Sequence, residues 1–256
     1  MAAASLASRL RAGETLLSGW STLTDPLVAE WVARQAFDCV IMDMQHSLHD
    51  IRSVTQSLSA LALVGKPGIV RVPLGDNASV SRAFDLGAAA VIAPMINSAV
   101  EARAFVAAAK YPPVGERSWG PNRALALSGR TGQGHLDVSN SETLAIVMIE
   151  TDRALSGLSE ILAVPGVDGV FVGPSDLSVT LSAGRSIAPG GANLDGPLAE
   201  IAAAASSAGK FAGVYAATAD RARHCIGMGY RLIGLGADTG YLAAGAIELL
   251  AAVRRA

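Results

Sequence analysis

Eight short apolar segments alternate with helical patterns along almost the whole chain, and this alternation constrains the fold more than any other feature. The apolar segments, rich in β-branched residues, lie at residues 16–20, 39–43, 68–73, 90–94, 145–150, 169–174, 211–216 and 232–237. Amphipathic helical patterns separate most of them, at residues 26–36, 51–64, 79–87, 99–110, 154–164, 198–209 and 218–229. Strands that are apolar throughout are buried on both faces, which indicates a parallel sheet covered by helices.

Eight strand–helix units predict that the sheet closes into a (β/α)8 barrel, the TIM-barrel fold of the α/β class. An open, doubly wound sheet is the alternative, but no glycine-rich dinucleotide-binding motif follows the first strand. A chain of 256 residues is long enough for one such barrel. We therefore expect residues 1–256 to form a single domain.

The composition limits the classes of partner. The net charge is -2, and no basic patch is large enough to follow a nucleic-acid backbone. The mean hydropathy is +0.39, yet no uninterrupted apolar run is long enough to span a bilayer. Cys39 and Cys225 lie in apolar surroundings, which predicts buried free thiols and a reducing compartment. We expect a soluble, cytoplasmic protein that acts on a small molecule.

Three segments fit the repeating pattern less well. Residues 1–11 predict a first helix that ends at Gly13, although their low acid content also suits a transit peptide. Residues 111–143 and 177–197 are glycine-rich connections longer than a barrel needs, so they predict lids, site walls or subunit contacts, with disordered surface as the alternative. Trp119 and Arg123 favour a functional role for the first connection.

Acidic residues end two neighbouring strands. Glu150 ends the fifth strand, and Asp176 follows the sixth after a Gly–Pro pair. Because barrel enzymes carry their chemistry at the C-terminal ends of the strands, the two carboxylates are expected to share a divalent cation such as Mg2+, Mn2+ or Co2+. Either acid could instead cap a helix or pair with an arginine. None of the three lysines is placed to form a Schiff base, which also favours a metal.

Polar residues also follow the second and third strands. His46 suits proton transfer, and Asp43, three residues earlier, could orient its imidazole. Arg71 lies among apolar residues, where an unpaired guanidinium is costly, so it requires an anion or a carbonyl oxygen. That partner is the substrate or, alternatively, Asp43 or Asp85. These residues predict a base and a cation at the same end of the barrel as the two acids.

Backbone amides add to this mouth. The amides of Ser175 and Asp176 follow Gly173 and Pro174, and they could donate hydrogen bonds to a substrate carboxylate. Trp20 ends the first strand and offers an aromatic wall.

Six motifs, in order along the chain, carry a resemblance to a known family. They lie at residues 43–50, 71–73, 111–120, 150–151, 166–178 and 236–239, and the run at 166–178 is the most specific. The chain resembles the HpcH/HpaI aldolase family, the metal-dependent (class II) pyruvate aldolases typified by 4-hydroxy-2-oxoheptanedioate aldolase. The motifs cover essentially the whole chain.

The resemblance implies a barrel of the phosphoenolpyruvate/pyruvate type that forms homo-oligomers, hexamers or trimers, often with the last helix exchanged between neighbours. It implies reversible cleavage of a 4-hydroxy-2-oxo acid into pyruvate, or a close analogue, and an aldehyde. It also implies the roles of the site residues: metal ligands Glu150 and Asp176; a base dyad of His46 and Asp43; Arg71 on the enolate oxygen; Asp85 near a metal-bound water; and Trp20, Gly173, Ser175 and Asp176 in the substrate pocket.

Two positions depart from the family pattern. The family usually has glutamate at the position of Gln45 and glutamine at that of Met148, which shares a strand face with Glu150. We expect the chemistry to be intact and the substrate preference to be altered. Three alternatives remain: a related phosphoenolpyruvate-type or acyl-CoA lyase, a non-catalytic barrel that binds an oxo acid, and a structural subunit.

Overall fold

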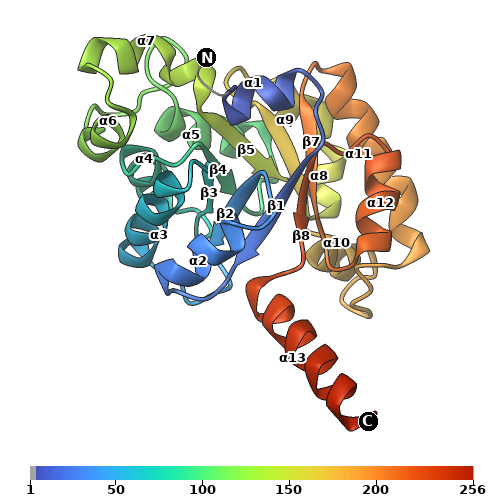
Figure 1. The fold of residues 1–256 in the computed structure, drawn as a ribbon. Coiled ribbons are helices and arrows are strands. Elements are labelled where there is room, and N and C mark those ends of the chain that lie inside the picture. The colour runs from blue at the N-terminus through green and yellow to red at the C-terminus, as the bar shows by residue number, and fades with distance from the viewer. Residues whose placement is uncertain (1–3, 256) are drawn as a thin grey trace.

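The barrel consists of eight parallel strands arranged in chain order, as the computed structural model of residues 4–255 shows (Figure 1). Each strand pairs with the next, and β8 pairs with β1 to close the sheet. The (β/α)8 barrel predicted from the sequence is confirmed, and the open sheet is excluded. The strands are β1 (Leu16–Ser21), β2 (Cys39–Asp43), β3 (Gly68–Arg71), β4 (Ala90–Ala93), β5 (Leu144–Met148), β6 (Gly169–Val172), β7 (Phe211–Ala216) and β8 (Leu232–Leu235).

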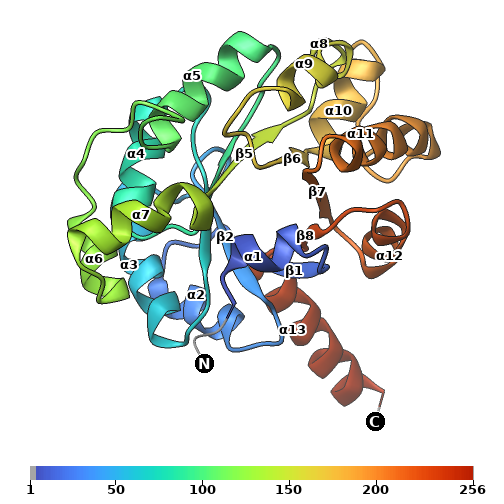
Figure 2. The same cartoon turned by 90° about the horizontal axis from the view of Figure 1, so that it is seen from above.

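Helices surround the barrel on its outer face (Figure 2). Several begin at a side chain that accepts a hydrogen bond from a first-turn amide, as Asp50 does for α3 and Thr218 for α12. The covering helices are α2 (Pro26–Ala33), α3 (Ile51–Leu63), α4 (Asn77–Asp85), α5 (Ala99–Ala109), α8 (Asp152–Ser156), α9 (Leu158–Leu162), α10 (Pro174–Leu181), α11 (Asp195–Ser207) and α12 (Ala219–Gly227).

The strands separate two apolar cores because their side chains point alternately to opposite faces. In β2, Val40 and Met42 pack against the helices, whereas Cys39 and Ile41 point into the barrel. Every residue of this strand is buried, which explains why the sequence shows a continuous apolar run instead of an alternating one. Cys39 and Cys225 are buried free thiols, as expected.

Helix α1 (Leu6–Arg11) closes the N-terminal end of the barrel, because Leu6, Ala7 and Leu10 join the interior core. The predicted first helix is confirmed for this part, and Gly13 follows it with a φ of 80°. The rest of that prediction, at residues 1–3, lies outside the described residues. Within residues 4–255, none of the helices combines the length and apolar character that crossing a membrane requires.

The two long connections hold more helix than the sequence predicted. Residues 111–143 contain α6 (Asn122–Ser128) and α7 (Gly132–Glu142). In the second connection α10 extends to Leu181 and the short η1 covers Ala192–Leu194, but residues 182–191 form neither helix nor strand. The glycine content of α7 hides its helical character, although Thr131 caps its first turn. Pro174 reads as a turn after β6 but occupies the first turn of α10, where proline is well tolerated.

An aromatic column fills one side of the barrel interior, and glycines on neighbouring strands make room for it. Phe211 lies opposite Gly169, and Phe171 lies opposite Gly213. A Cβ atom added at Gly169 or Gly213 would come within 2.6 Å of the facing ring. Gly234 likewise leaves space for Trp20, whose ring centroid is 5.9 Å from that of Phe171. The column thus runs from the α1 end of the barrel towards the C-terminal ends of the strands.

We expect a Gly213→Ala substitution to destabilise the protein by about 1–3 kcal/mol, because the new methyl group would displace the Phe171 ring in a close-packed core. Urea unfolding would measure this change. Gly196→Ala is the matched control: it lies in α11 with nothing within 4 Å of the added Cβ, so it should leave stability unchanged or slightly increased. Equal stability of the two variants would contradict the packing described.

Helix α13 (Asp238–Arg254) leaves the opposite end of the barrel from α1 and points away from it (Figure 1). Asp238 is its only buried residue in the described chain. Five of its large apolar side chains are exposed to 53% or more: Leu242, Ile247, Leu249, Leu250 and Val253. An apolar helix that packs so little on its own barrel is suited to packing elsewhere.

Candidate active site

The polar residues that the sequence placed at strand ends do gather at the C-terminal end of the barrel. Asp43 and Arg71 are the last residues of β2 and β3, which are directly paired. Glu150 follows β5 by two residues, and Asp176 lies in the first turn of α10 after β6. Since consecutive strands are neighbours in the sheet, one mouth holds all four.

Glu150 is the most unusual group at this mouth. Its side chain is 1% exposed, and its Oε2 accepts a hydrogen bond from the Met95 amide at 2.9 Å. Its Oε1 is buried without a hydrogen-bond partner among residues 4–255. Burial raises the pKa of Glu150 to about 7, the nearby Asp176 adds to the rise, and the Met95 amide and Arg71 oppose it. This carboxylate therefore has an unsatisfied oxygen where charge is costly.

The surroundings of Glu150 leave little room beside that oxygen. A Cβ atom at Gly173 would come within 2.2 Å of Oε1, so a side chain there would displace the Glu150 carboxylate. Met95 has a φ of 55°, an uncommon conformation for a residue with a side chain, and Asn97 donates a hydrogen bond to its carbonyl at 2.9 Å. Thr151 in turn bonds to Asn97. The loop after β4 is thus fixed so that its amide reaches Glu150.

The donor set here fits a divalent cation. Glu150 supplies a buried oxygen without a partner, and Asp176 is close enough for its charge to raise the Glu150 pKa. Carboxylate oxygens are the ligands that hard cations prefer. Among the described residues, no cluster of three or more His, Cys, Asp or Glu residues is arranged around a single point, so protein ligation would rest on these two carboxylates.

Arg71 forms a buried ion pair with Asp43. Its Nε and Nη2 donate to Oδ1 and Oδ2 at 2.9 and 2.6 Å, and the two side chains are 9% and 3% exposed. Burial alone would raise the pKa of Asp43, but Arg71 outweighs it and the pKa lies below its ordinary value. Arg71 also lies over the Trp20 ring, 5.0 Å from its centroid. A guanidinium has five N–H donors, so three remain after the bidentate pair.

The predicted contact between Asp43 and the His46 imidazole is not formed. Asp43 instead accepts hydrogen bonds from the backbone amides of Gln45 and His46, at 2.9 and 3.3 Å, in addition to Arg71. Of the two alternative partners considered for Arg71, Asp43 is therefore the one that it has. A buried guanidinium requires such a nearby anion. His46 lies exposed at the rim of the mouth.

Asp85 lies away from this mouth within the chain. It is the last residue of α4, which returns to the N-terminal end of β4, and it pairs with Arg117 at 2.6 Å. The sequence predicted Asp85 near a metal-bound water, but within the chain α4 carries it to the opposite end of the barrel. Ser175 and Asp176 occupy the first turn of α10, where backbone amides have no partner within the helix.

The two departures from the family pattern lie beside the acids. Met148 is 1% exposed, and its Cε would be 3.2 Å from a Cβ atom at Gly173, so it forms an apolar wall close to Glu150. The Oε1 of Gln45 is buried without a hydrogen-bond partner in the described part of the chain.

Tyr215 was missed from the sequence. It lies one residue before the end of β7, with its ring edge against Trp20 at 5.2 Å between centroids. Burial raises the pKa of its hydroxyl, and the charge of Arg71 opposes the rise. Because Tyr215 lies near the C-terminal end of the seventh strand, the rule that strand ends carry the site does predict it. The hydrogen bond from the Met95 amide to Glu150 could not be predicted, because a backbone donor does not depend on the type of side chain.

Comparisons with known proteins agree with one another. The profile of the HpcH/HpaI aldolase/citrate lyase family matches residues 17–244. The hydroxypyruvate/pyruvate aldolase of Rhizorhabdus wittichii is 36% identical over 242 residues, covering 94% of this chain and 95% of the relative. The 2-keto-3-deoxy-L-rhamnonate aldolase of Escherichia coli is 32% identical over 90% of this chain and 86% of its own. The crystal structure of an HpcH/HpaI aldolase from Desulfitobacterium hafniense superposes with a TM-score of 0.90 at 26% identity, over 99% of this chain and 98% of that one.

Proposed function

The chain belongs to the HpcH/HpaI aldolase/citrate lyase family, and from this premise we propose that it is a metal-dependent aldolase. The proposed reaction is the reversible cleavage of a 4-hydroxy-2-oxo acid into an aldehyde and pyruvate, or a close analogue such as hydroxypyruvate. The names of the relatives support this substrate class. The observation that carries the proposal is the buried Glu150 oxygen without a partner, beside Asp176.

Glu150 and Asp176 would hold a divalent cation such as Mg2+, Mn2+ or Co2+. When bound, the cation supplies a Lewis acid that polarises the keto group of the substrate. The unpaired Glu150 oxygen would gain a partner in that state, which would offset the cost of its burial.

The remaining steps belong to side chains and amides of this chain. His46 takes the proton of the C4 hydroxyl, the C3–C4 bond breaks, and its electron pair forms the enolate of pyruvate while the aldehyde departs. Arg71 donates a hydrogen bond to the enolate oxygen as negative charge develops there. Asp43 holds the guanidinium in place, and the amides of Ser175 and Asp176 bind the substrate carboxylate.

Removal of metal tests this proposal directly. The purified protein, stripped with a chelator, should lose aldol addition of pyruvate or hydroxypyruvate to a panel of aldehydes. Activity should return on addition of Mg2+, Mn2+ or Co2+, and the panel would identify the preferred acceptor. Aldolase activity that persists at its full rate without metal would overturn the proposal.

We also propose that the chain forms a homo-oligomer, a hexamer or a trimer, in which α13 packs against a neighbouring protomer. Two observations support this: the exposed apolar side chains of α13, and a cavity of about 380 Å³ beside α2 that is lined by Val28, Trp31, Val32, Gln35, Phe37, Asp238, Tyr241 and Leu242. Burying apolar surface of this kind drives most stable association.

A Leu249→Glu substitution in α13 is expected to shift the protein to a smaller assembly, because it places a charge in the proposed interface. Light scattering coupled to gel filtration would measure the mass. The control is Glu248→Gln, which changes the neighbouring residue without adding apolar surface and should retain the wild-type mass. An unchanged mass for Leu249→Glu would count against the role of α13.

A further inference from the structure

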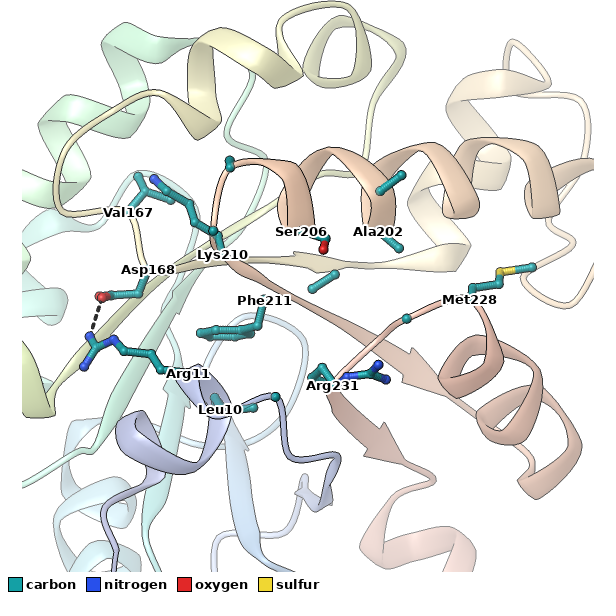
Figure 3. Close-up of a pocket in the computed structure, with 16 residues that line it drawn as sticks. Leu10, Arg11, Val167, Asp168, Ala202, Ser206, Lys210, Phe211, Met228 and Arg231 are labelled. Carbon is teal, nitrogen blue, oxygen red and sulfur yellow. Dashed lines mark hydrogen bonds and ion pairs between the residues drawn. The ribbon is translucent and has the colours of Figure 1, made fainter.

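A second cavity, of about 720 Å³, lies at the N-terminal end of the barrel, away from the candidate active site (Figure 3). Its walls come from the end of α1, from α11 and from the residues that lead into β6, β7 and β8. Leu10, Phe211 and Met228 supply apolar surface, and Figure 3 shows basic side chains around the Phe211 ring. A volume of this size accommodates a small metabolite.

Three basic side chains and a single acid line this cavity. The basic ones are Arg11, Lys210 and Arg231, and the acid is Asp168. Asp168 is already shared between two cations: it pairs with Arg11 at 2.8 Å and with the buried Lys110 at 2.7 Å. Among the residues that line this cavity, the positive charges therefore outnumber the one carboxylate.

Lys210 and Arg231 are the cations that this carboxylate does not pair with. Among residues 4–255, neither forms an ion pair with an acidic side chain; each donates instead to a main-chain carbonyl, of Val164 and Tyr230 respectively, at 3.2 Å. Both are only partly exposed. A partly buried cation without a direct ion pair is costly, and a bound anion that contacts either head group would relieve that cost.

From this arrangement we propose that the N-terminal cavity binds a small polyanion, meaning a metabolite that carries a phosphate group or at least two carboxylates. Charge-assisted hydrogen bonds from Arg231 and Lys210 would hold the anionic groups, and Phe211 would face the carbon skeleton. The site is independent of the proposed aldolase chemistry, because its residues lie at the other end of the strands.

Isothermal titration calorimetry on the full-length, metal-loaded protein tests this site. The probes are glycerol 3-phosphate, tricarballylate and, as a neutral control, glycerol, all at constant ionic strength in potassium chloride. Saturable binding of glycerol 3-phosphate alone assigns the site to phosphates, and binding of tricarballylate alone assigns it to carboxylates. Raising the salt concentration should weaken either one, since the attraction is electrostatic.

Two variants locate the binding. Ser206→Asp places a negative charge on the exposed wall of the cavity, and Arg231→Gln removes a cation; each should weaken binding at least tenfold. Ser207→Asp adds the same charge at the next position of α11, outside the cavity lining, and should change binding less than twofold. Aldolase activity should be unaffected in all three. The proposal is overturned if no charged probe saturates, or if Ser206→Asp binds as the wild type does.

Discussion

A Glu150→Gln variant is expected to lose aldolase activity by about a thousandfold or more, because the substitution replaces a charged metal ligand with a neutral amide. The loss corresponds to roughly 4 kcal/mol of transition-state stabilisation, the order expected for a Lewis acid at a developing enolate. Steady-state kinetics with saturating metal would measure it. Glu160→Gln, an exposed acid in α9, is the matched control and should retain full activity.

The same variant has a distinct effect on the metal-free protein. The pKa of Glu150 lies at about 7 in the folded state and near 4.5 in the unfolded chain. A raised pKa means that the folded state favours the protonated acid, so this contribution to stability is present below about pH 4.5 and is lost as the pH rises to about 7. The difference corresponds to about 3 kcal/mol at most.

Urea unfolding of the metal-free protein across that pH range would reveal this loss. Glu150→Gln cannot ionise, so the variant should lack this part of the pH dependence and should be at least as stable as the wild type at pH 8. A parallel pH dependence in both proteins would show that Glu150 is ionised throughout and would contradict the burial argument.

An Arg71→Met variant is expected to lose both activity and stability. Activity should fall by about a hundredfold to a thousandfold, the usual effect of removing one hydrogen-bond donor from an enolate or oxyanion site. Stability should fall by about 3–5 kcal/mol, because Asp43 would remain buried and charged without its partner. Kinetics and urea unfolding would measure the two losses separately.

A double variant separates these effects. Asp43→Asn combined with Arg71→Met removes the unpaired charge, while the asparagine oxygen can still accept from the amides of Gln45 and His46. Most of the lost stability should return, and the activity should not. Recovery of activity in the double variant would mean that Arg71 serves the fold alone and does not touch the substrate.

The sequence predicted the barrel well because its signal is repeated eight times. Strands such as β2 are buried on both faces, so their apolar runs can be recognised without knowledge of the partner strands. The glycine-rich α7 and the proline that begins α10 were harder, since local propensity there is weak or ambiguous and tertiary packing decides the structure.

The site was predicted in part for a related reason. Glu150 and Asp176 could be placed because strand ends meet at one mouth, whatever the details of packing. Which acid Arg71 selects depends on side-chain geometry that spacing does not encode, and the sequence left Asp43 and Asp85 open. The hydrogen bond from the Met95 amide to Glu150 depends on a left-handed backbone conformation at Met95, which a methionine does not predict.

The pairing of aromatic residues with glycines on β6 and β7, and of Trp20 in β1 with Gly234 in β8, has a consequence for engineering. Each large ring and the glycine opposite share one volume, so the cost of changing one depends on the residue at the other. A Phe171→Leu substitution should reduce the destabilisation caused by Gly213→Ala, because the smaller side chain leaves room for the added methyl group. Libraries that vary these strands one residue at a time would discard viable solutions that a two-site design retains.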